Sequence, residues 1–468
     1  MTHPLLDILV QQQHSCPFHT PGHQRGRGMA APLRALWGTA LAQDLSEIPG
    51  LDNLAAPTGA LADLQAAIAA AAGSDRAWCL VNGATAGVLA ALLATLEPKD
   101  VVLVGRNVHH SVISGLILTG AQPVYLGVAV DSLWGIPEPV SLATVVNAVA
   151  AYPTAKAVVL VSPTYEGLCS PLAAIAQHVH ERGLTLIVDE AHGSHFAFHP
   201  RFPSTALAAG ADLVIQSWHK TLGTLTQTAV LHLQGTRVAP ERVSHAVTLV
   251  QTTSPSYWLL SALEAAAWQM VHQGYEIYDR LLQWVAAFES PLPRLERLDI
   301  PQDPLRLTLG TWPLGLTGAD LEAQLQPDII AELPSGRSLT FCVGLGTTAQ
   351  MLRTLAERLR AIHQTHQPVQ PLPPIAVPPL PAVSSPALSP RTTYFSQRQV
   401  VPLAAAIDHI SAETIAPYPP GIPTIIAGEV ITAAAVAELQ QVQAMGGTIL
   451  GATDPQLNQI TIVTPADT

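Results

Sequence analysis

The sequence predicts an α/β protein built on a mainly parallel β-sheet that is covered by helices on both faces. Seven short apolar runs, rich in β-branched residues, alternate with helical segments in the first half of the chain. After about residue 290 the runs become shorter, which indicates a smaller α+β domain. A stretch with nine prolines between Pro368 and Pro390 then precedes a last compact α+β domain.

The predicted elements follow this alternation along the chain. The strands of the large, seven-stranded sheet are expected at Ala77–Val81, Val101–Val104, Pro123–Gly127, Ala157–Val161, Leu184–Asp189, Asp212–Gln216 and Ala229–Leu233. Helices are expected at Gly59–Ala72, from the Asn82-Gly83 turn to Leu96, at Ser256–Phe288, Thr348–Ile362 and Thr432–Met445. One more strand is expected at Gln459–Val463, in the last domain.

These elements predict five segments. Residues 1–30 are polar and turn-rich and read as an N-terminal arm, followed by a large domain over residues 31–290 and a small α+β domain over residues 291–363. The proline-rich residues 364–392 are expected to form an extended tether without packed structure. Residues 393–468 form the C-terminal domain.

Composition and charge exclude several classes of function. The net charge is −12 at pH 7 and only 12% of residues are charged, so nucleic acid has no basic surface to bind. No apolar run reaches the length that spans a membrane, and the N-terminus lacks a basic region before its apolar residues. The scattered cysteines, Cys16, Cys79, Cys169 and Cys342, contain no C-x-x-C pair and are expected as free thiols. We therefore expect a cytoplasmic protein.

Lys220 is the most reactive candidate in the chain. The other two lysines, Lys99 and Lys156, lie in charged connectors, whereas Lys220 closes Ser217-Trp218-His219-Lys220 after an apolar strand. Desolvation and nearby positive charge lower the pKa of a lysine and free its amine to form a Schiff base with a carbonyl group. The alternative is a lysine at a helix start that faces water.

Two further motifs follow strands of the predicted sheet. Asn82-Gly83-Ala84-Thr85 opens a helix whose first N–H groups and Thr85 hydroxyl suit a phosphate, although any Asn-Gly turn before a helix looks similar. Asp189-Glu190-Ala191-His192 also occurs in helicases, but none of the lysines lies in a G-x-x-x-x-G-K phosphate loop. A zinc site made by His192, His195 and His199 is a third possibility, without an accompanying H-E-x-x-H helix.

Together, the three motifs predict one binding site. Ligands bind at the carboxyl ends of the strands in such sheets, so the three motifs meet in one site. Pyridoxal phosphate requires a lysine that bonds its aldehyde and an acid that pairs with its ring nitrogen. Lys220 and Asp189 supply these groups, and Ser217 adds a phosphate contact. The sequence therefore predicts a pyridoxal 5'-phosphate site without a metal ion.

With this site in view, the chain resembles the ornithine/lysine/arginine decarboxylases, pyridoxal phosphate enzymes of the aspartate-aminotransferase fold, in a short form without the N-terminal wing domain. The matching motifs are Thr20-Pro21-Gly22-His23, Ile48-Pro49-Gly50-Leu51-Asp52, Val81-Asn82-Gly83-Ala84-Thr85, Arg106-Asn107-Val108-His109-His110-Ser111, Ser162-Pro163-Thr164-Tyr165-Glu166-Gly167, Asp189-Glu190-Ala191-His192-Gly193, Ser217-Trp218-His219-Lys220, Ile410-Ser411-Ala412-Glu413 and Pro417-Tyr418-Pro419-Pro420-Gly421-Ile422-Pro423. They cover nearly the whole chain in the family's order.

The resemblance implies a role for each matching residue. Lys220 would carry the cofactor, Asp189 would pair with the pyridinium nitrogen, His192 would lie near the ring hydroxyl, and His109 would stack on the ring. Ala84, Thr85, Ser217 and His219 would surround the phosphate, and Lys220 or His219 would return a proton to Cα. Tyr418 would bring the C-terminal domain to the mouth of the site. The family also implies at least a homodimer, with its sites at the subunit interface.

The expected substrate is a basic amino acid, most favourably L-arginine converted to agmatine for polyamine synthesis, or lysine converted to cadaverine. Acids in family-matching places, Glu47, Asp52, Glu332 and Glu413, are candidates to meet its side chain, and each could equally be structural. The family's usual lysines are replaced by Gln24 and His110, and its Gly-Arg pair by Asp408-His409, which leaves the substrate open. An aminotransferase and a catalytically silent regulatory relative are the alternatives.

Overall fold

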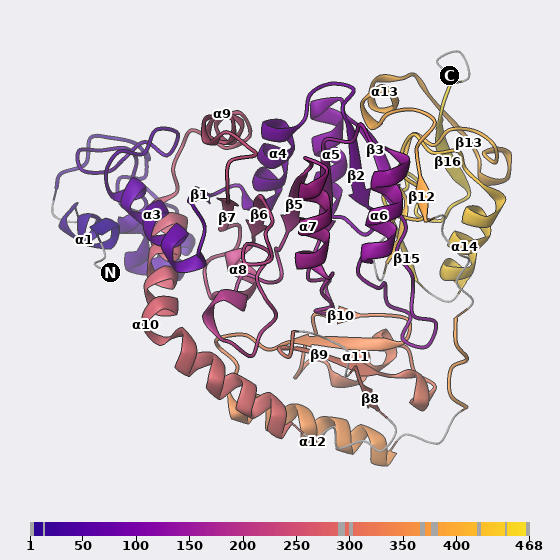
Figure 1. The fold of residues 1–468 in the computed structure, drawn as a ribbon. Helices are drawn as coiled ribbons and strands as arrows, with labels where there is room; N and C mark the ends of the chain where they lie inside the picture. Colours follow the sequence, from indigo (N-terminus) through magenta and orange to yellow (C-terminus); the bar gives the residue numbers. More distant parts are fainter. Residues whose placement is uncertain are drawn as a thin grey trace. The chain divides into compact units, whose positions relative to one another are not determined.

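The computed structural model describes residues 4–12, 15–288, 295–298, 303–365, 370–375, 382–418, 423–444 and 447–464. The chain divides into two compact units (Figure 1). The first unit comprises residues 1–94 and 188–279, and the second comprises residues 95–187 and 280–468. Within the described ranges, no helix has both the length and the apolar character needed to cross a membrane.

The first unit contains the strands that lead to Lys220. Its strands are β1 (Arg76–Leu80), β6 (Leu213–Gln216) and β7 (Ala229–Leu233), and β7 runs antiparallel to both β1 and β6. Its helices are α1 (Pro4–Gln11), α2 (Ala31–Trp37), α3 (Ala60–Ala72), α4 (Gly83–Thr95), α8 (Trp218–Thr221), α9 (Pro240–Val250) and most of α10 (Tyr257–Ala287). Every residue of β6 and β7 is buried, which is why their sequences are apolar apart from Gln216 and His232.

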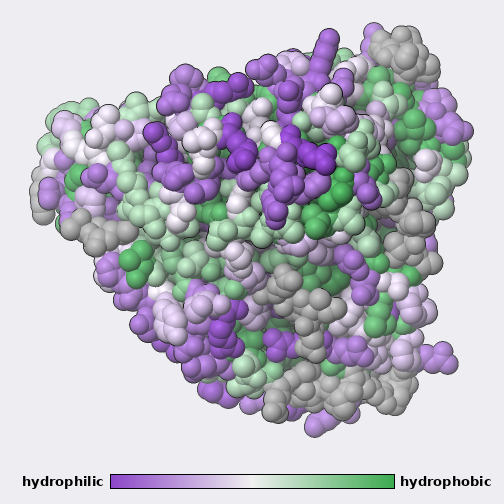
Figure 2. All heavy atoms as spheres, viewed as in Figure 1, coloured by the Kyte–Doolittle hydropathy of each residue, from purple (hydrophilic) through white to green (hydrophobic). Residues whose placement is uncertain are grey.

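The second unit begins with a parallel set of strands. Strand β2 (Val101–Gly105) pairs in parallel with β3 (Gln122–Leu126) and with β4 (Ala157–Val161). Helices α5 (His110–Thr119), α6 (Leu142–Ala151) and α7 (Leu172–Glu181) connect or follow these strands. Helix α7 buries a stripe at positions i, i+3, i+4 and i+7, formed by Leu172, Ile175, Ala176 and Val179. Figure 2 shows many hydrophilic side chains on the face of this unit where α5, α6 and α7 lie.

The large sheet has the strand order β1-β7-β6-β5-β4-β2-β3-β12, with β5 at Thr185–Asp189. All seven predicted strands are present, and the prediction of a mainly parallel α/β sheet is confirmed. The sheet contains one strand more than the seven predicted. This eighth strand, β12 (Val383–Ser384), pairs antiparallel with β3 and comes from the proline-rich segment.

The remaining sheets belong to the second unit. A four-stranded sheet has the order β10-β11-β9-β8, with strands at Leu333–Pro334, Ser338–Cys342, Arg306–Gly310 and Glu296–Arg297, and is accompanied by α11 (Gly318–Leu325) and α12 (Ala349–Thr365). Further elements are α13 (Pro390–Phe395), α14 (Ala433–Ala444) and the strand pairs β13 (Arg398–Pro402) with β16 (Gln459–Val463) and β14 (Ala416–Tyr418) with β15 (Thr448–Leu450). A separate apolar core that includes Leu403, Ile415 and Leu439 holds the C-terminal elements together. The helices predicted at 256–288, 348–362 and 432–445 correspond to α10, α12 and α14, except that Met445 lies outside the described residues.

The proline-rich segment is packed where it is described, contrary to the expected free tether. The Leu372 N–H donates to the Trp312 carbonyl at 2.9 Å, and the Ile375 N–H donates to the Ser132 carbonyl at 3.0 Å. The Arg337 guanidinium donates to the Leu372 carbonyl at 3.2 Å. These hydrogen bonds replace the ladder that prolines cannot form, so an extended backbone is held without regular structure. The domain boundaries drawn from the sequence remain a prediction.

The N-terminal arm contains a helix that the sequence did not predict. Helix α1 buries Leu5 and Leu9, and its first N–H groups point at the carboxylate of Glu264. The Leu5 and Leu6 N–H groups donate to the two Glu264 oxygens at 3.0 and 2.9 Å. A buried carboxylate therefore caps the positive end of α1 and holds the arm on α10.

Candidate active site

Lys220 lies on the short helix α8, immediately after the buried strand β6. Its Nζ is 2.9 Å from Nε2 of His192, which follows the end of β5. The side chain of Lys220 is exposed, whereas Trp218, two residues earlier, is fully buried. The expectation of a buried lysine is wrong for the single chain, because one turn of helix directs Trp218 into the core and Lys220 away from it.

Asp189 is the buried acid of this site. Its side chain is in the core, and Oδ1 accepts a hydrogen bond from the Ala191 N–H at 3.1 Å. Burial raises the pKa of Asp189, and the positive charge of Lys220 opposes that shift. A protonated ring nitrogen would give this carboxylate the partner that a buried charge requires. The donors and acceptors present therefore fit pyridoxal phosphate.

The start of helix α4 fits the phosphate end of such a cofactor. Gly83 has φ +74°, which lets the chain turn sharply from β1 into α4. Ala84 is half-buried and Thr85 is exposed in the first turn, where the backbone N–H groups of a helix have no partner within it. Ser217 is buried at the start of α8. Contacts of these residues with a phosphate remain a prediction.

His219 is held by a loop that the sequence did not single out. Its Nδ1 lies 2.8 Å from the Thr228 carbonyl oxygen, which can only accept, so Nδ1 carries the hydrogen. In the neutral ring Nε2 is then the atom that can accept a proton. The Thr228 hydroxyl in turn lies 2.5 Å from that of Thr224. The sequence marks this loop only as a short segment with several threonines between two strands, which does not predict the hydrogen bond from His219 to Thr228.

His109 belongs to the second unit and caps α5. Its Nδ1 lies 2.9 Å from the Ser111 hydroxyl, and its ring centroid is 4.0 Å from that of His110. Stacking of His109 on the cofactor stays a prediction. The expected role of Tyr418 concerns a side chain outside the described part of the structure, and residues 419–422 of the same motif are also outside it.

Two of the four acids proposed to meet the substrate have internal partners. Asp52 Oδ2 accepts hydrogen bonds from the N–H groups of Thr58, Gly59 and Leu61 at the start of α3. Glu413 is buried and accepts from the Thr461 hydroxyl at 2.7 Å and from the backbone of the same residue at 3.2 Å. Both therefore act as structural acceptors. Glu47 and Glu332 remain candidates.

The alternative of a zinc site at three histidines has no support. His192 is hydrogen-bonded to Lys220, and His195 packs edge-on against Phe202. The Nε2 atom of His199 lies 3.7 Å from Oδ1 of Asp279. Among the described residues, no group of three His, Cys, Asp or Glu side chains could hold a metal ion.

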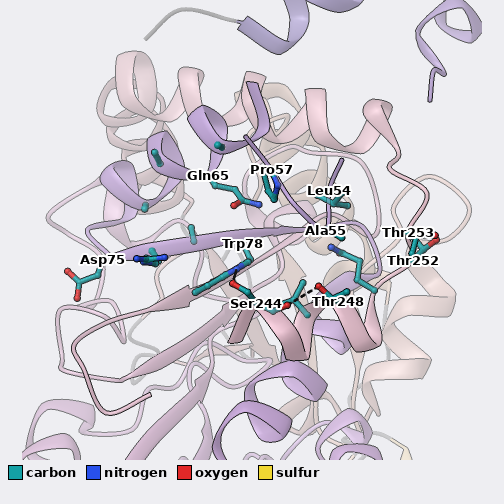
Figure 3. A pocket seen from close by; sticks show the side chains of 17 residues that line it. Leu54, Ala55, Pro57, Gln65, Asp75, Trp78, Ser244, Thr248, Thr252 and Thr253 are labelled. Atoms are coloured by element: carbon teal, nitrogen blue, oxygen red, sulfur yellow. Dashed lines mark hydrogen bonds between the residues drawn. The ribbon is translucent and has the colours of Figure 1, made fainter. Parts of the chain in front are cut away.

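A cavity of about 330 Å³ lies at the free edge of β1, between α3 and α9 (Figure 3). Its described lining includes none of the eight predicted site residues. Figure 3 shows Thr248 beside Ser244, whose carbonyl accepts the Thr248 hydroxyl at 3.0 Å. Gln251 pairs with the Val81 N–H at 2.8 Å and with the Cys79 carbonyl at 3.4 Å, as a neighbouring strand would. We assign no reaction to this cavity.

A lysine beside a buried carboxylate, at the carboxyl ends of strands in an α/β sheet, is the arrangement of pyridoxal phosphate enzymes. The chain belongs to the ornithine/lysine/arginine decarboxylases, a pyridoxal phosphate-dependent family of amino-acid carboxy-lyases. The family's major domain, described as "Orn/Lys/Arg decarboxylase, major domain", matches residues 3–301, and its C-terminal domain matches residues 379–449. The predicted family is thus confirmed.

Two arginine decarboxylases match this chain over nearly their full length. The chain is 31% identical to an arginine decarboxylase of Halalkalibacterium halodurans, covering 98% of this chain and 97% of the relative. It is also 31% identical to an arginine decarboxylase of Bacillus subtilis, covering 95% and 94%. Its fold is similar to that of the lysine decarboxylase LdcF of Francisella novicida, with a TM-score of 0.84, 22% identity, and coverage of 99% of this chain and 81% of that one.

Proposed function

We propose that this protein decarboxylates L-arginine to agmatine in the cytoplasm, with pyridoxal 5'-phosphate attached to Lys220. The observation that carries the proposal is the contact of 2.9 Å between Lys220 Nζ and His192 Nε2, beside the buried carboxylate of Asp189. Similarity to arginine decarboxylases over nearly the full chain supports the choice of arginine. Lysine, converted to cadaverine, is the second choice.

Each residue of the site has a task in this reaction. Bound pyridoxal phosphate would supply the electron sink for the pair left behind when the α-carboxylate departs as carbon dioxide. Asp189 would keep the ring nitrogen protonated by offering its carboxylate as partner. His192 orients Lys220 through its hydrogen bond at Nζ. Lys220 Nζ or His219 Nε2 would then deliver the proton that Cα requires.

The deciding measurement is kcat/KM for arginine, lysine, ornithine and glutamate, followed by carbon dioxide release and identification of the amine product. We expect arginine to rank first. Preference for lysine would overturn only the ranking, whereas preference for glutamate would contradict a basic substrate. Transfer of the amine to a keto acid without gas release would identify an aminotransferase instead.

We also propose that the active form is at least a homodimer. Phe18 is 92% exposed and Leu36 is 77% exposed in the N-terminal part of the chain, and both are large apolar side chains. Trp37, which packs on Trp258 at 5.2 Å between ring centroids, is also exposed. Exposed apolar groups of this size suit a protein interface. Sedimentation of the active enzyme should show a dimer or larger assembly, and an active monomer would contradict the proposal.

A further inference from the structure

A chain of buried polar side chains lies directly behind the strand ends that carry Asp189 and Lys220. Glu190 and Gln216 are each only 1% exposed. Gln216 Nε2 donates to Glu190 Oε2 at 2.7 Å, and the Ala206 N–H donates to Glu190 Oε1 at 2.6 Å. These side chains join the segment that contains Asp189 to the segment that contains Lys220.

The donors and acceptors of this chain fit in one arrangement. The indole N–H of Trp218 can only donate, so the side-chain oxygen of Gln216 must face it, at 3.1 Å. His232 Nε2 lies 3.1 Å from the same oxygen and must also donate, while its Nδ1 lies 3.0 Å from the Ser74 hydroxyl. Burial lowers the pKa of His232 to about 3, which agrees with a neutral ring. The amide NH₂ group of Gln216 is left for Glu190, which must accept it.

Glu190 and Gln216 lie close in the sequence to the reactive residues of the active site. The Glu190 N–H donates to the Ile215 carbonyl at 2.8 Å. The hydrogen bond between the Glu190 and Gln216 side chains is a second link between the same two segments. Asp189 directly precedes Glu190, and Lys220 follows Gln216 by four residues. A shift within the pair therefore moves the reactive acid and the reactive amine relative to each other.

We propose that Glu190 and Gln216 are positioning residues that fix Lys220 against Asp189 and His192. The inference rests on the proposed function, in which these three side chains hold the cofactor. A role in core packing alone would not require an acid here, because an apolar pair fills a core without burying charge. Burial raises the pKa of Glu190 to about 8, and the hydrogen bonds from Gln216 and the Ala206 N–H oppose that rise.

The test exchanges the two side chains. Two donors face residue 190, the Ala206 N–H and the Gln216 amide. Because Trp218 and His232 fix the orientation of the Gln216 amide, the new side chain in Glu190→Gln can accept from only one of these donors and must place its own NH₂ group against the other. In Gln216→Glu, two carboxyl groups face each other. The double variant Glu190→Gln/Gln216→Glu restores every donor–acceptor pair, since the new amide donates to the new carboxylate. Glu241→Gln, at an exposed position in the first turn of α9, is the matched control.

Three readouts are taken on holoenzymes: kcat, the pH midpoint of the visible absorbance of the bound cofactor, and Tm. We expect each single variant to lower kcat between about tenfold and about 100-fold and to shift the pH midpoint. The double variant should return both toward the wild-type values, and Glu241→Gln should change neither. If the single variants lose only Tm, or if the double variant recovers Tm without the midpoint, the positioning role is refuted.

The outcomes also separate this inference from the proposed function. A wild-type protein that binds no cofactor or releases no carbon dioxide would refute the function itself. An active wild type whose single variants keep the wild-type midpoint would refute only the positioning role. If neither single variant folds, the double variant decides alone. A double variant that folds and has the wild-type pH midpoint supports the inference, and a double variant with a shifted midpoint overturns it.

Discussion

Replacement of Arg106 by Ala should release the C-terminal elements of the second unit. Arg106 follows β2 and is 5% exposed, and its Nη1 and Nη2 donate to the two Glu429 carboxylate oxygens at 2.6 and 2.7 Å. Its Nη2 and Nε also donate to the carbonyls of Thr424 and Pro423 at 3.0 and 3.2 Å. Loss of the guanidinium leaves the Glu429 carboxylate with the Ile426 N–H as a remaining donor, at 3.0 Å. Breaking a buried ion pair from one side costs about 3–5 kcal/mol.

Native-state hydrogen exchange measures this loss where it occurs. In Arg106→Ala, amides of α14 should exchange with an opening free energy lowered by about 3–5 kcal/mol, whereas those of β6 should not change. Arg106→Lys keeps the charge but not the paired geometry and should recover only part of the loss. The double variant Arg106→Met/Glu429→Leu removes both charges and should lose much less than Arg106→Ala. A loss below about 1 kcal/mol in α14 for Arg106→Ala would show that the buried pair does not hold these elements.

Three further predictions test other parts of the chain. Lys220→Ala should abolish fixation of pyridoxal phosphate by borohydride, and labelling that persists at Lys99 or Lys156 would contradict the assignment of Lys220. Asp52→Ala removes the acceptor of three N–H groups at the start of α3 and should lower the free energy of unfolding by about 1–2 kcal/mol, with Asp52→Asn losing less; equal stability of all three proteins would contradict the capping role. His232→Gln should make the free energy of unfolding depend less on pH in the acid range. The His232 side chain binds a proton at its ordinary pKa of 6.5 in the unfolded chain, but in the folded chain burial lowers this pKa to about 3. Wild-type stability should therefore fall, through this group, by up to about 1.4 kcal/mol per unit as the pH drops from 6.5 toward 3, and parallel pH curves of the two proteins would refute the shift.

The strands were predictable because burial on both faces removes the need for polar residues. Strand β4 coincides with the predicted Ala157–Val161, and β16 coincides with Gln459–Val463. The approach of His192 to Lys220 follows from the same pattern, since both residues come directly after strands that end at one edge of the sheet. Sequence order and hydrophobicity are sufficient for this level of the structure.

Two features of the chain were not predictable from local sequence. The exposure of Lys220 depends on the direction in which a single helical turn points, and a flanking apolar strand does not determine that direction. The packing of the proline-rich segment depends on Arg337 and Trp312, which lie far from Leu372 in the sequence. Composition predicts an extended segment here, but neither strand β12 nor the long-range hydrogen bonds that hold the segment.

Within one motif, the residue that reacts and the residue that supports it are neighbours in the sequence. Asp189 offers its carboxylate to the reaction site, while Glu190, on the alternate side of the chain, bonds to Gln216 in the core. In the same way Lys220 is exposed, whereas Trp218, two residues earlier, is buried and donates a hydrogen bond to Gln216. A substitution beside a reactive residue can therefore remove activity without touching substrate. The exchange of Glu190 and Gln216 separates the two effects, because it preserves the hydrogen bonds and changes only which side chain carries the acid.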